Sequence, residues 1–399
     1  MEETVFFLNS NKGKSLLAFG IADEVKCNAQ EKALNRLEKF YEKYRNKYIF
    51  GYLGYDLKNE IENLTSENKD FAGFPDLYFF LPEFVVEIEK EKIVYLQGSP
   101  TQESENFVKS FFDKSKAIKE SKVHLTPQIS KSEYIDTVEK LLSHLQRGDI
   151  YEVTFCQNFI GENAEINPKS TYFELNAHTK APMSCYVNIN EHYLMSGSPE
   201  RFLKKEGNRL ISQPIKGTAA RKEDSILDEK AKHDLLHDEK ERAENVMIVD
   251  LVRNDLSRVA SKGSVNVDEL FGVYTFPTVH QLISTISCEI KPEKSIREII
   301  EALFPMGSMT GAPKYSAMQL IEKYEVFKRG LFSGAVGYFE PNGDFDFNVI
   351  IRSILYNSES KIVSCPVGGA ITIQSEPENE FEECLVKVDA MRKILNGYV

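Results

Sequence analysis

The chain has 399 residues, of which 42% are hydrophobic and 28% are charged, and its formal net charge is −12. A chain of this length and composition is expected to fold, either as two domains or as one large domain with an attached lobe. The acidic balance and the lack of a basic cluster exclude nucleic acid as an expected partner.

The sequence also predicts neither export nor insertion into a membrane. The opening MEETVFFLNSNKGKS lacks a basic n-region and a long apolar segment. No apolar stretch approaches the roughly 20 residues that span a bilayer. The six cysteines have no CxxC spacing, which is typical of proteins in a reducing compartment. We therefore expect a cytoplasmic protein without membrane contacts.

Residues 1–125 are predicted to form a small mixed lobe. Strands are expected at VFFLN, YIFGYLGYDL and LYFFLPEFVVEIE, and helices over residues 30–45 and 103–119. A polar segment without periodicity then leads into a larger unit, residues 126–399.

The larger unit is predicted to begin with an amphipathic helix that starts near Ser132 and ends at Gly148. Its expected buried stripe consists of Ile135, Val138, Leu142 and Leu145. A strand over 151–159 should follow.

Further along the chain, the pattern alternates between helices and strands. Short strands are expected near 193–195 and 209–212, and then a long helical region over 226–252. The last third is predicted to contain a helix over 315–324, strands over 331–339, 346–356 and 361–373, and a closing helix over 378–395. Short turns between consecutive strands indicate antiparallel pairing, so the predicted fold class is α+β.

Two pairs of glutamates are spaced three residues apart on predicted helices, Glu241 with Glu244 and Glu380 with Glu383. Each pair lies on one helical face. Four carboxylates brought together suit a hard divalent cation such as magnesium, whereas a solvated acidic helix surface is the simpler alternative. Lys387 follows Glu383 by one turn, so this polar stripe is a candidate wall of a cleft.

A second candidate is Arg352, which falls in a predicted strand between two isoleucines of the same face. A guanidinium on an apolar surface needs an anion, and both a ligand carboxylate and a structural salt bridge satisfy that need. Tyr338 and a predicted turn lie on neighbouring strands. The small residues of the turn, Gly368, Gly369 and Ala370, would let backbone N–H groups approach a carboxylate.

The third candidate joins Glu200 in SGSPERF with Lys216 in PIKGTAAR. A buried glutamate with a raised pKa serves as a general acid, and a lysine with a lowered pKa serves as a nucleophile. A plain ion pair in the core explains the two residues equally well.

Taken together, these motifs resemble the chorismate-utilising enzyme family. The resemblance runs from about residue 132 to the C-terminus through GDIYEV, SGSPERF, PIKGTAAR, KERAENVMIVDLVRNDL, TFPTVHQLIS, GSMTGAPK, SGAVGY, FNVIIRS and SEPENEFEE. FGYLGYDL in the first lobe is similar to that of the glutamine-dependent members. The resemblance implies a fold like that of anthranilate synthase component I, with a large antiparallel sheet core of two packed sheets flanked by helices.

The resemblance also implies roles for single residues. Magnesium would be bound by the four glutamates, with Glu244 and Glu383 as direct ligands and Glu241 and Glu380 acting through water. Chorismate would be the substrate, its carboxylates held by Tyr338, Arg352, the N–H groups of Gly368, Gly369 and Ala370, and Lys387, and its ring lined by His280, Ser308 and Gly311. Glu200 would be the general acid that protonates the departing 4-hydroxyl.

Lys216 points to one branch of the family, because members that make anthranilate, isochorismate or salicylate usually carry Ala at this position. The resemblance implies an aminodeoxychorismate synthase component I, in which Lys216 attacks C2 and ammonia then adds at C4. Anthranilate synthase component I and a non-catalytic protein that binds an anion and a metal remain the alternatives.

Two points concern the source and handling of ammonia. No residue set of a glutamine amidotransferase is apparent, so ammonia would come from solution or from a separate glutamine amidotransferase subunit. Glu152 occupies a position where ammonia-using relatives commonly carry Gln and water-using relatives carry Lys. Glu152 either accepts hydrogen bonds from ammonia or pairs with Lys216.

Overall fold

The computed structural model describes residues 4–11, 13–90, 92–113 and 122–396. The strands are β1 Val5–Asn9, β2 Ser15–Cys27, β3 Ile49–Leu53, β4 Leu77–Glu89, β5 Lys92–Gln97, β6 Thr126–Pro127, β7 Glu152–Gly161, β8 Met183–Ile189, β9 His192–Ser198, β10 Arg201–Glu206, β11 Arg209–Gln213, β12 Ile215–Ala220, β13 Asn266–Thr275, β14 Val279–Glu289, β15 Gly311–Ala312, β16 Ala335–Phe339, β17 Phe345–Val349, β18 Ser353–Asn357 and β19 Ile362–Ile371. The α-helices are α1 Ala33–Tyr44, α2 Lys58–Ile61, α3 Gln102–Phe112, α4 Lys131–Arg147, α5 Pro168–Thr179, α6 Ser225–His237, α7 Glu239–Ser257, α8 Ile296–Leu303, α9 Lys314–Tyr324 and α10 Pro377–Asn396, with 3₁₀ turns at Ala29–Glu31, Tyr55–Leu57 and Gly307–Met309.

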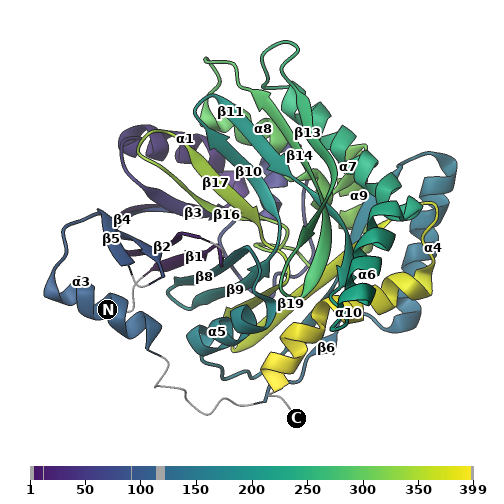
Figure 1. Cartoon of the computed structure of the whole chain (residues 1–399), viewed down its shortest axis with the longest axis horizontal. Coiled ribbons are helices and arrows are strands. Elements are labelled where there is room, and N and C mark those ends of the chain that lie inside the picture. Colours follow the sequence, from purple (N-terminus) through teal and green to yellow (C-terminus); the bar gives the residue numbers. More distant parts are fainter. Residues whose placement is uncertain (1–3, 12, 91, 114–121, 397–399) are drawn as a thin grey trace.

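Hydrogen bonds join the 19 strands of the described residues into one network, and its strand pairings are antiparallel. The network curves over on itself, with helices along its outside (Figure 1). The predicted α+β class with an antiparallel core is therefore confirmed, and the two expected layers belong to one continuous set of paired strands.

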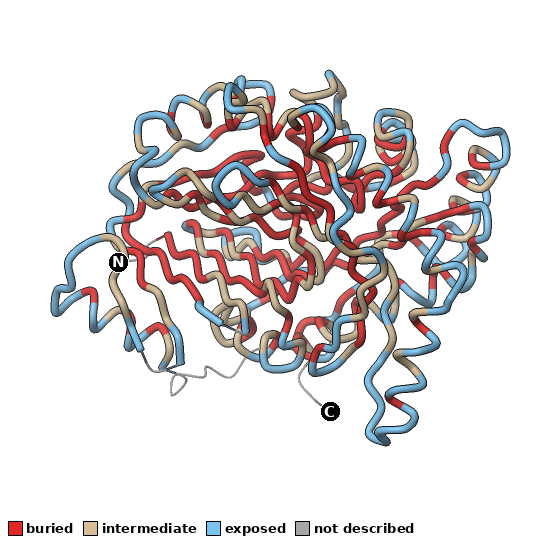
Figure 2. The backbone as a smooth tube through the Cα atoms, turned by 45° about the horizontal axis from the view of Figure 1, so that its top comes forward, coloured by how far each residue is buried: buried red, intermediate tan, exposed pale blue. Residues whose placement is uncertain are grey.

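Three groups of buried apolar side chains hold the fold together. One group comes mostly from strands, including Phe6, Phe50 and Leu355, and fills the interior of the curved sheet. A second lies under α3, α4, α5 and α10, and a third under α1, α7 and α8. The buried strands accordingly run through the centre of the molecule, while the helices expose their outer faces (Figure 2). This is the arrangement expected when each helix buries one apolar stripe against a sheet.

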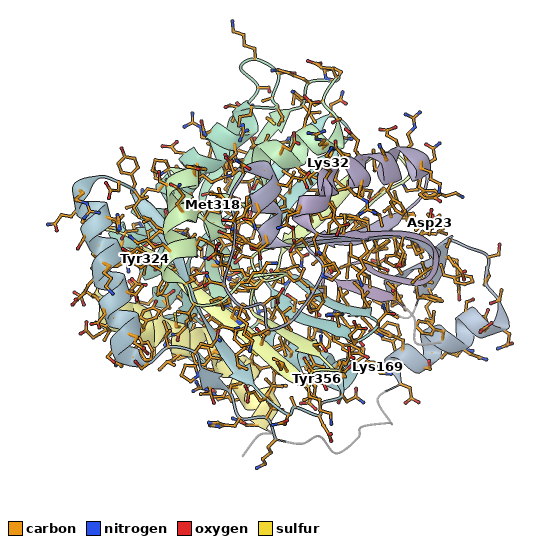
Figure 3. All side chains as sticks on the ribbon, turned by 180° about the vertical axis from the view of Figure 1, so that it is seen from behind. Asp23, Lys32, Lys169, Met318, Tyr324 and Tyr356 are labelled. Carbon is orange, nitrogen blue, oxygen red and sulfur yellow. The ribbon has the colours of Figure 1, made fainter. Side chains whose placement is uncertain are left out.

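Helix α4 shows how local sequence sets the ends of an element. Ser130 and Glu133 form a capping box at its start, and Gly148 ends it with φ +79°, as predicted. Of the predicted stripe Val138 and Leu145 are buried. The helix packs near α9, where the hydroxyl of Tyr324 lies 3.1 Å from His144 Nε2 (Figure 3).

The structure differs from three predicted elements. The long helix over 226–252 is broken at Asp238, whose backbone is extended and whose side chain accepts a hydrogen bond from the Glu241 N–H at 2.9 Å. Asp238 thus caps α7 and separates it from α6. The strand over 346–356 is interrupted between β17 and β18, and Arg352 lies in the gap with φ +52°. The predicted helix over 103–119 ends at Phe112, and residues 114–119 lie outside the described part of the chain.

Strands of the first lobe pair with strands of the larger unit, across the predicted boundary between residues 125 and 126. The division of the chain into two domains stays a prediction. β1 pairs with β8, and β3 pairs with β16 so that Gly51 faces Gly337. A Cβ at Gly51 would lie 2.3 Å from the Tyr78 carbonyl oxygen. Glycine is therefore required for the close approach of β3 to β4 inside the first lobe, and β3 in turn pairs with β16 of the larger unit.

Two further observations bear on the environment of the protein. In the described residues no helix has both the length and the apolar character needed to cross a membrane. All six cysteines are buried and unpaired.

We predict that Gly51→Ala lowers the free energy of unfolding by about 3 kcal/mol, because the new methyl group would overlap the backbone of β4. Gly13→Ala is the matched control, since its Cβ would meet nothing closer than 3.6 Å. Denaturant titration of both variants checks the prediction, and equal stabilities would contradict it.

Candidate active site

Lys216 and Glu152 form a buried ion pair at the centre of the candidate site. Lys216 lies on β12 and Glu152 begins β7, and their Nζ and Oε1 atoms are 2.6 Å apart. Burial lowers the pKa of Lys216, but carboxylates led by Glu152 and Glu244 outweigh burial and leave that pKa above its ordinary value. The lysine is therefore an ammonium at rest, and the prediction of a lowered pKa is wrong.

Glu200 lies beside this pair in the short connection between β9 and β10. It is 5% exposed, and it accepts hydrogen bonds from the Ser308 hydroxyl and from the backbone of Ile215. Burial raises the pKa of Glu200 to about 7, although these hydrogen bonds and Lys216 oppose the rise. A carboxyl group with a pKa near 7 is suited to donate a proton at neutral pH.

The two glutamate pairs converge from different helices. Helix α7 lies against β12 and β14, and α10 lies against β19 (Figure 1). The Nζ atom of Lys240 lies 3.9 Å from Glu244 Oε1 and 3.4 Å from Glu380 Oε1, so one ammonium touches carboxylates of both helices. Glu241 and Glu383 are close enough for their charges to interact.

The charge of this cluster shifts the titration of its members. Burial raises the pKa of Glu244 to about 7, and Glu241 adds to the rise. Burial also works to raise the pKa of Glu383, but Lys387 and Lys240 outweigh it and leave that pKa below its ordinary value. In the described part of the chain no three acidic, His or Cys side chains already form a ligand set for a metal.

Arg352 is a partly buried cation, and no counter-ion contacts it in the described part of the chain. Among the described residues no hydrogen bond or ion pair within 4.0 Å reaches its guanidinium, and Glu383 acts on it only at longer range. Burial lowers the pKa of Arg352 below its ordinary value. Removing a guanidinium from water costs free energy unless an anion pairs with it. Because no protein carboxylate pairs with Arg352 among the described residues, a ligand carboxylate is favoured over a structural salt bridge.

Arg352 and Lys387 line one cavity of about 220 Å³. Lys387 donates to the Gly368 carbonyl oxygen at 2.6 Å and pairs with Glu383. Gly368, Gly369 and Ala370 do not form a turn as predicted; they lie within β19, where Gly369 faces Phe155 of β7. The φ of Ala370 is not positive, so an alanine fits this position.

His280 and its neighbour Gln281 point in opposite directions, as adjacent residues of a strand must. The two ring nitrogens of His280 lie 3.0 Å from Thr275 Oγ1 and 3.0 Å from Asp228 Oδ1, away from the cavity. Gln281 lines the cavity; it is 4% exposed, and its Oε1 atom has no hydrogen-bond partner among the described residues. The sequence reasoning did not single out Gln281, because strand alternation alone does not tell which of two neighbouring residues faces a cavity.

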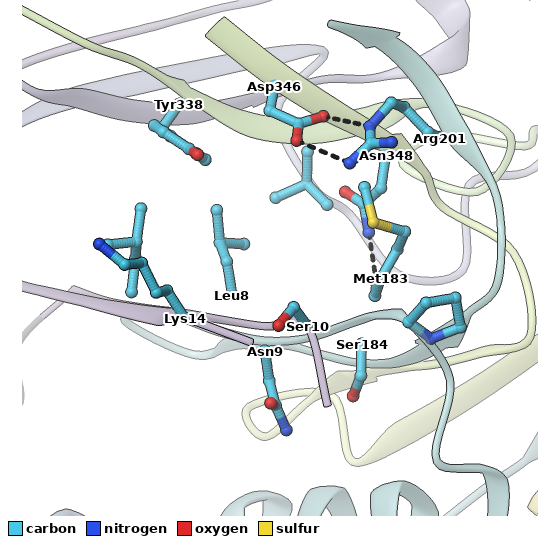
Figure 4. A pocket seen from close by; sticks show the side chains of 13 residues that line it. Leu8, Asn9, Ser10, Lys14, Met183, Ser184, Arg201, Tyr338, Asp346 and Asn348 are labelled. Atoms are coloured by element: carbon cyan, nitrogen blue, oxygen red, sulfur yellow. Dashed lines mark hydrogen bonds and ion pairs between the residues drawn. The ribbon is translucent and has the colours of Figure 1, made fainter. Parts of the chain in front are cut away.

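Tyr338 is not brought to this site. It lines a different pocket, opposite the ion pair that Arg201 forms with Asp346 at 2.8 Å (Figure 4). That pocket lies between β1, β8 and β16 and shares only Pro182 with the cavity of Arg352. Tyr338 and Arg352 thus line different pockets, and a shared role for them at the substrate stays a prediction.

Ser308 and Gly311 lie in the segment of residues 307–312, which contacts Glu200 and Glu152. Ser308 is in the 3₁₀ turn after α8 and contacts Glu200. Gly311 is in β15, and a Cβ there would lie 2.1 Å from the Glu152 carbonyl oxygen. Gly311 thus permits the close contact between β15 and β7 that places Glu152.

Comparison with known proteins identifies the family. The model of the family described as chorismate binding enzyme matches residues 2–393. The chain belongs to this family. Lys216 and the four helix glutamates thus belong to a chain of the family that the motifs implied.

Three relatives illustrate the likeness. The chain is 35% identical over 384 residues to the chloroplastic aminodeoxychorismate synthase of Arabidopsis thaliana, covering 88% of this chain and 41% of that protein. It is 31% identical over 361 residues to aminodeoxychorismate synthase component 1 of Bacillus subtilis, covering 86% and 76%. The crystal structure of anthranilate synthase component I from Streptococcus pneumoniae superposes with a TM-score of 0.83 at 25% identity, covering 95% and 92%. This superposition confirms the predicted fold.

We predict that Glu200→Gln makes stability less dependent on pH. The folded state binds this proton more tightly than the unfolded chain, so the stabilisation is complete below about pH 4.5 and is lost as pH rises through about 7. The parent protein should therefore lose roughly 3 kcal/mol over this range that the variant does not lose. Denaturant titrations between pH 4.5 and 8 measure the difference, with Glu105→Gln at an exposed position as the control. Parallel curves for parent and variant would refute the raised pKa.

Proposed function

We propose that this protein converts chorismate and ammonia to 4-amino-4-deoxychorismate, as an aminodeoxychorismate synthase component I in the route to para-aminobenzoate and folate. The observation that carries the proposal is the buried contact of Lys216 with Glu152 beside Glu200. An amine, a carboxylate that accepts its proton and a carboxyl group that donates one are the parts that the reaction requires.

The reaction balances as two substitutions. Lys216 passes a proton to Glu152, and its free amine attacks C2 of chorismate while the C4–O bond breaks and Glu200 protonates the departing hydroxyl to water. Ammonia then attacks C4, the C2–N bond breaks, and the lysine leaves as a neutral amine. The proton released from the new C4 ammonium returns to a carboxylate of the site. Because Lys216 occupies C2, ammonia is directed to C4.

The cavity residues are suited to hold the substrate. Arg352 and Lys387 supply two cations for carboxylates, and the guanidinium has no competing partner among the described residues. The Gln281 amide offers an acceptor to a hydroxyl group of the ring.

Magnesium fits the acidic cluster. Its oxygen donors suit a hard cation, and burial raises the pKa values of Glu241 and Glu244, with neighbouring carboxylates adding to the rise. Glu244 and Glu383 would be direct ligands, with Glu241 and Glu380 acting through water. When bound, the ion would supply the positive charge that holds the ring carboxylate of chorismate.

Ammonia would come from solution or from a separate glutamine amidotransferase subunit. A cytoplasmic location is consistent with six unpaired cysteines. The rival function is anthranilate synthase component I, the name of the solved structure with a TM-score of 0.83.

Product analysis separates these functions. With chorismate, magnesium and an ammonium salt, the parent chain should form a product that becomes para-aminobenzoate only after a lyase is added, whereas anthranilate would be fluorescent at once. Lys216→Ala should lower the rate of C4 amination by about a hundredfold or more, because the nucleophile is gone. Lys230→Ala, at an exposed position of α6, is the control. Binding of chorismate without any product would instead support a non-catalytic binding protein.

Metal binding should depend on both helices. Glu244→Gln and Glu383→Gln are each expected to weaken binding of magnesium, or of manganese as its spectroscopic substitute, at least about tenfold. Lys240→Gln should strengthen it, because the ammonium that touches Glu244 and Glu380 competes with the ion. Titration calorimetry measures the three affinities, with Glu378→Gln at an exposed position of α10 as the control. Unchanged affinities would exclude this cluster as the metal site.

A further inference from the structure

A buried ion pair lies behind the candidate site and has no part in the chemistry described above. Glu325 follows α9, and Arg329 lies in the connection to β16; they are 5% and 3% exposed. The pair is bidentate, with Arg329 Nε 2.9 Å from Glu325 Oε2 and Nη2 2.6 Å from Oε1. An ion pair of this kind repays its burial only when the remaining donors are also satisfied.

The other donors of Arg329 reach two backbone segments of the site. Nη2 donates to the Thr154 carbonyl oxygen at 2.8 Å, and Nη1 donates to the Met309 carbonyl oxygen at 2.7 Å. Nη1 also donates to Ser333 Oγ at 3.3 Å, so all five N–H groups of the guanidinium are used. Thr154 lies two residues after Glu152, and Met309 follows Ser308 directly.

Glu325 and Thr154 complete the connection. The carboxylate of Glu325 accepts the Cys156 N–H of β7 at 2.9 Å. Thr154 donates from Oγ1 to the Ser308 carbonyl oxygen at 2.9 Å, and its N–H donates to the Thr310 carbonyl oxygen at 2.8 Å. The strand that carries Glu152 and the loop that carries Ser308 are thus tied together at several points.

The first lobe closes the other side of the guanidinium. The ring of Tyr55 lies 4.6 Å from the guanidinium carbon of Arg329. Tyr55 N–H donates to the Gly330 carbonyl oxygen at 2.8 Å, and Gly330 N–H donates to Asp56 Oδ2 at 2.8 Å. The segment GYLGYDL of the first lobe therefore packs directly against the residue that ties the site.

We propose that Arg329 is a positioning residue, which holds β7 against the loop of residues 307–311 and so sets the placement of Glu152 and Ser308, with Tyr55 of the first lobe holding Arg329 in place. The inference rests on the proposed function, because that function makes the partners of Lys216 and Glu200 the reacting groups. A planar fork with five donors does this work, and an ammonium with three donors cannot replace it.

Arg329→Lys in the full chain tests the inference. It keeps the charge opposite Glu325 but loses at least two of the five hydrogen bonds. The value of kcat should fall about 10- to 100-fold while KM for chorismate changes little, because misplacement of the reacting groups leaves the carboxylate-binding cations intact. Arg258→Lys is the matched control, since Arg258 donates to the Ala302 carbonyl oxygen outside this network. An unchanged kcat in folded Arg329→Lys would overturn the inference.

Two further measurements keep the test decisive. If Arg329→Lys does not fold, Tyr55→Leu is compared with Tyr55→Phe, because within the described residues the Tyr55 hydroxyl has no hydrogen-bond partner, and its ring lies against Arg329. Lower kcat in the leucine variant alone supports the inference, and equal rates overturn it. Hydrogen exchange of residues 152–158 and 306–312 should accelerate in Arg329→Lys relative to α5. If the parent chain turns over no chorismate, the proposed function fails, and exchange still decides whether Arg329 couples the two segments.

Discussion

Buried negative charge is the constraint on which the candidate site depends. Glu152, Glu200 and Glu244 lie around the ammonium group of Lys216, and Lys240 contacts only Glu244 of the three, so the carboxylates outnumber the cations here. The excess is met partly by protons, since burial raises the pKa of Glu200 and of Glu244 to about 7. The second cluster, across α7 and α10, gathers further carboxylates around Lys240 and Lys387.

The curved antiparallel sheet is what makes such a concentration of charge possible. Lys216 and Glu152 are 64 residues apart in the sequence, and Lys240 and Glu380 are 140 residues apart. Each lies at the end of a strand or in a helix whose apolar face is fixed by the core, so the polar side chains need not supply the packing energy. The core therefore holds the charged side chains close together, although burying them is itself unfavourable.

Much of the fold and part of the site could be predicted from residues alone. The ends of α4 followed from Gly148 and its polar start, and the glutamate pairs followed from helical spacing. The prediction that Arg352 lies inside a strand was wrong. Its backbone has a positive φ, and the local sequence gives no signal for that conformation at an arginine. His280 was named from the resemblance, whereas Gln281 lines the cavity, because the face of β14 that meets the cavity is set by pairing with β12 and not by the local sequence. Tyr338 was expected at the substrate carboxylates from the resemblance, and the structure places it in another pocket.

The pairing of β3 with β16, and of β1 with β8, has a consequence for any attempt to divide the chain. Expression of residues 126–399 alone would uncover the backbone donors and acceptors of two long strand borders at once. Such borders recruit strands from other molecules, so the fragment would be expected to aggregate and not to act as a minimal enzyme. The first lobe is thus an intramolecular shield for the sheet, whatever else it contributes.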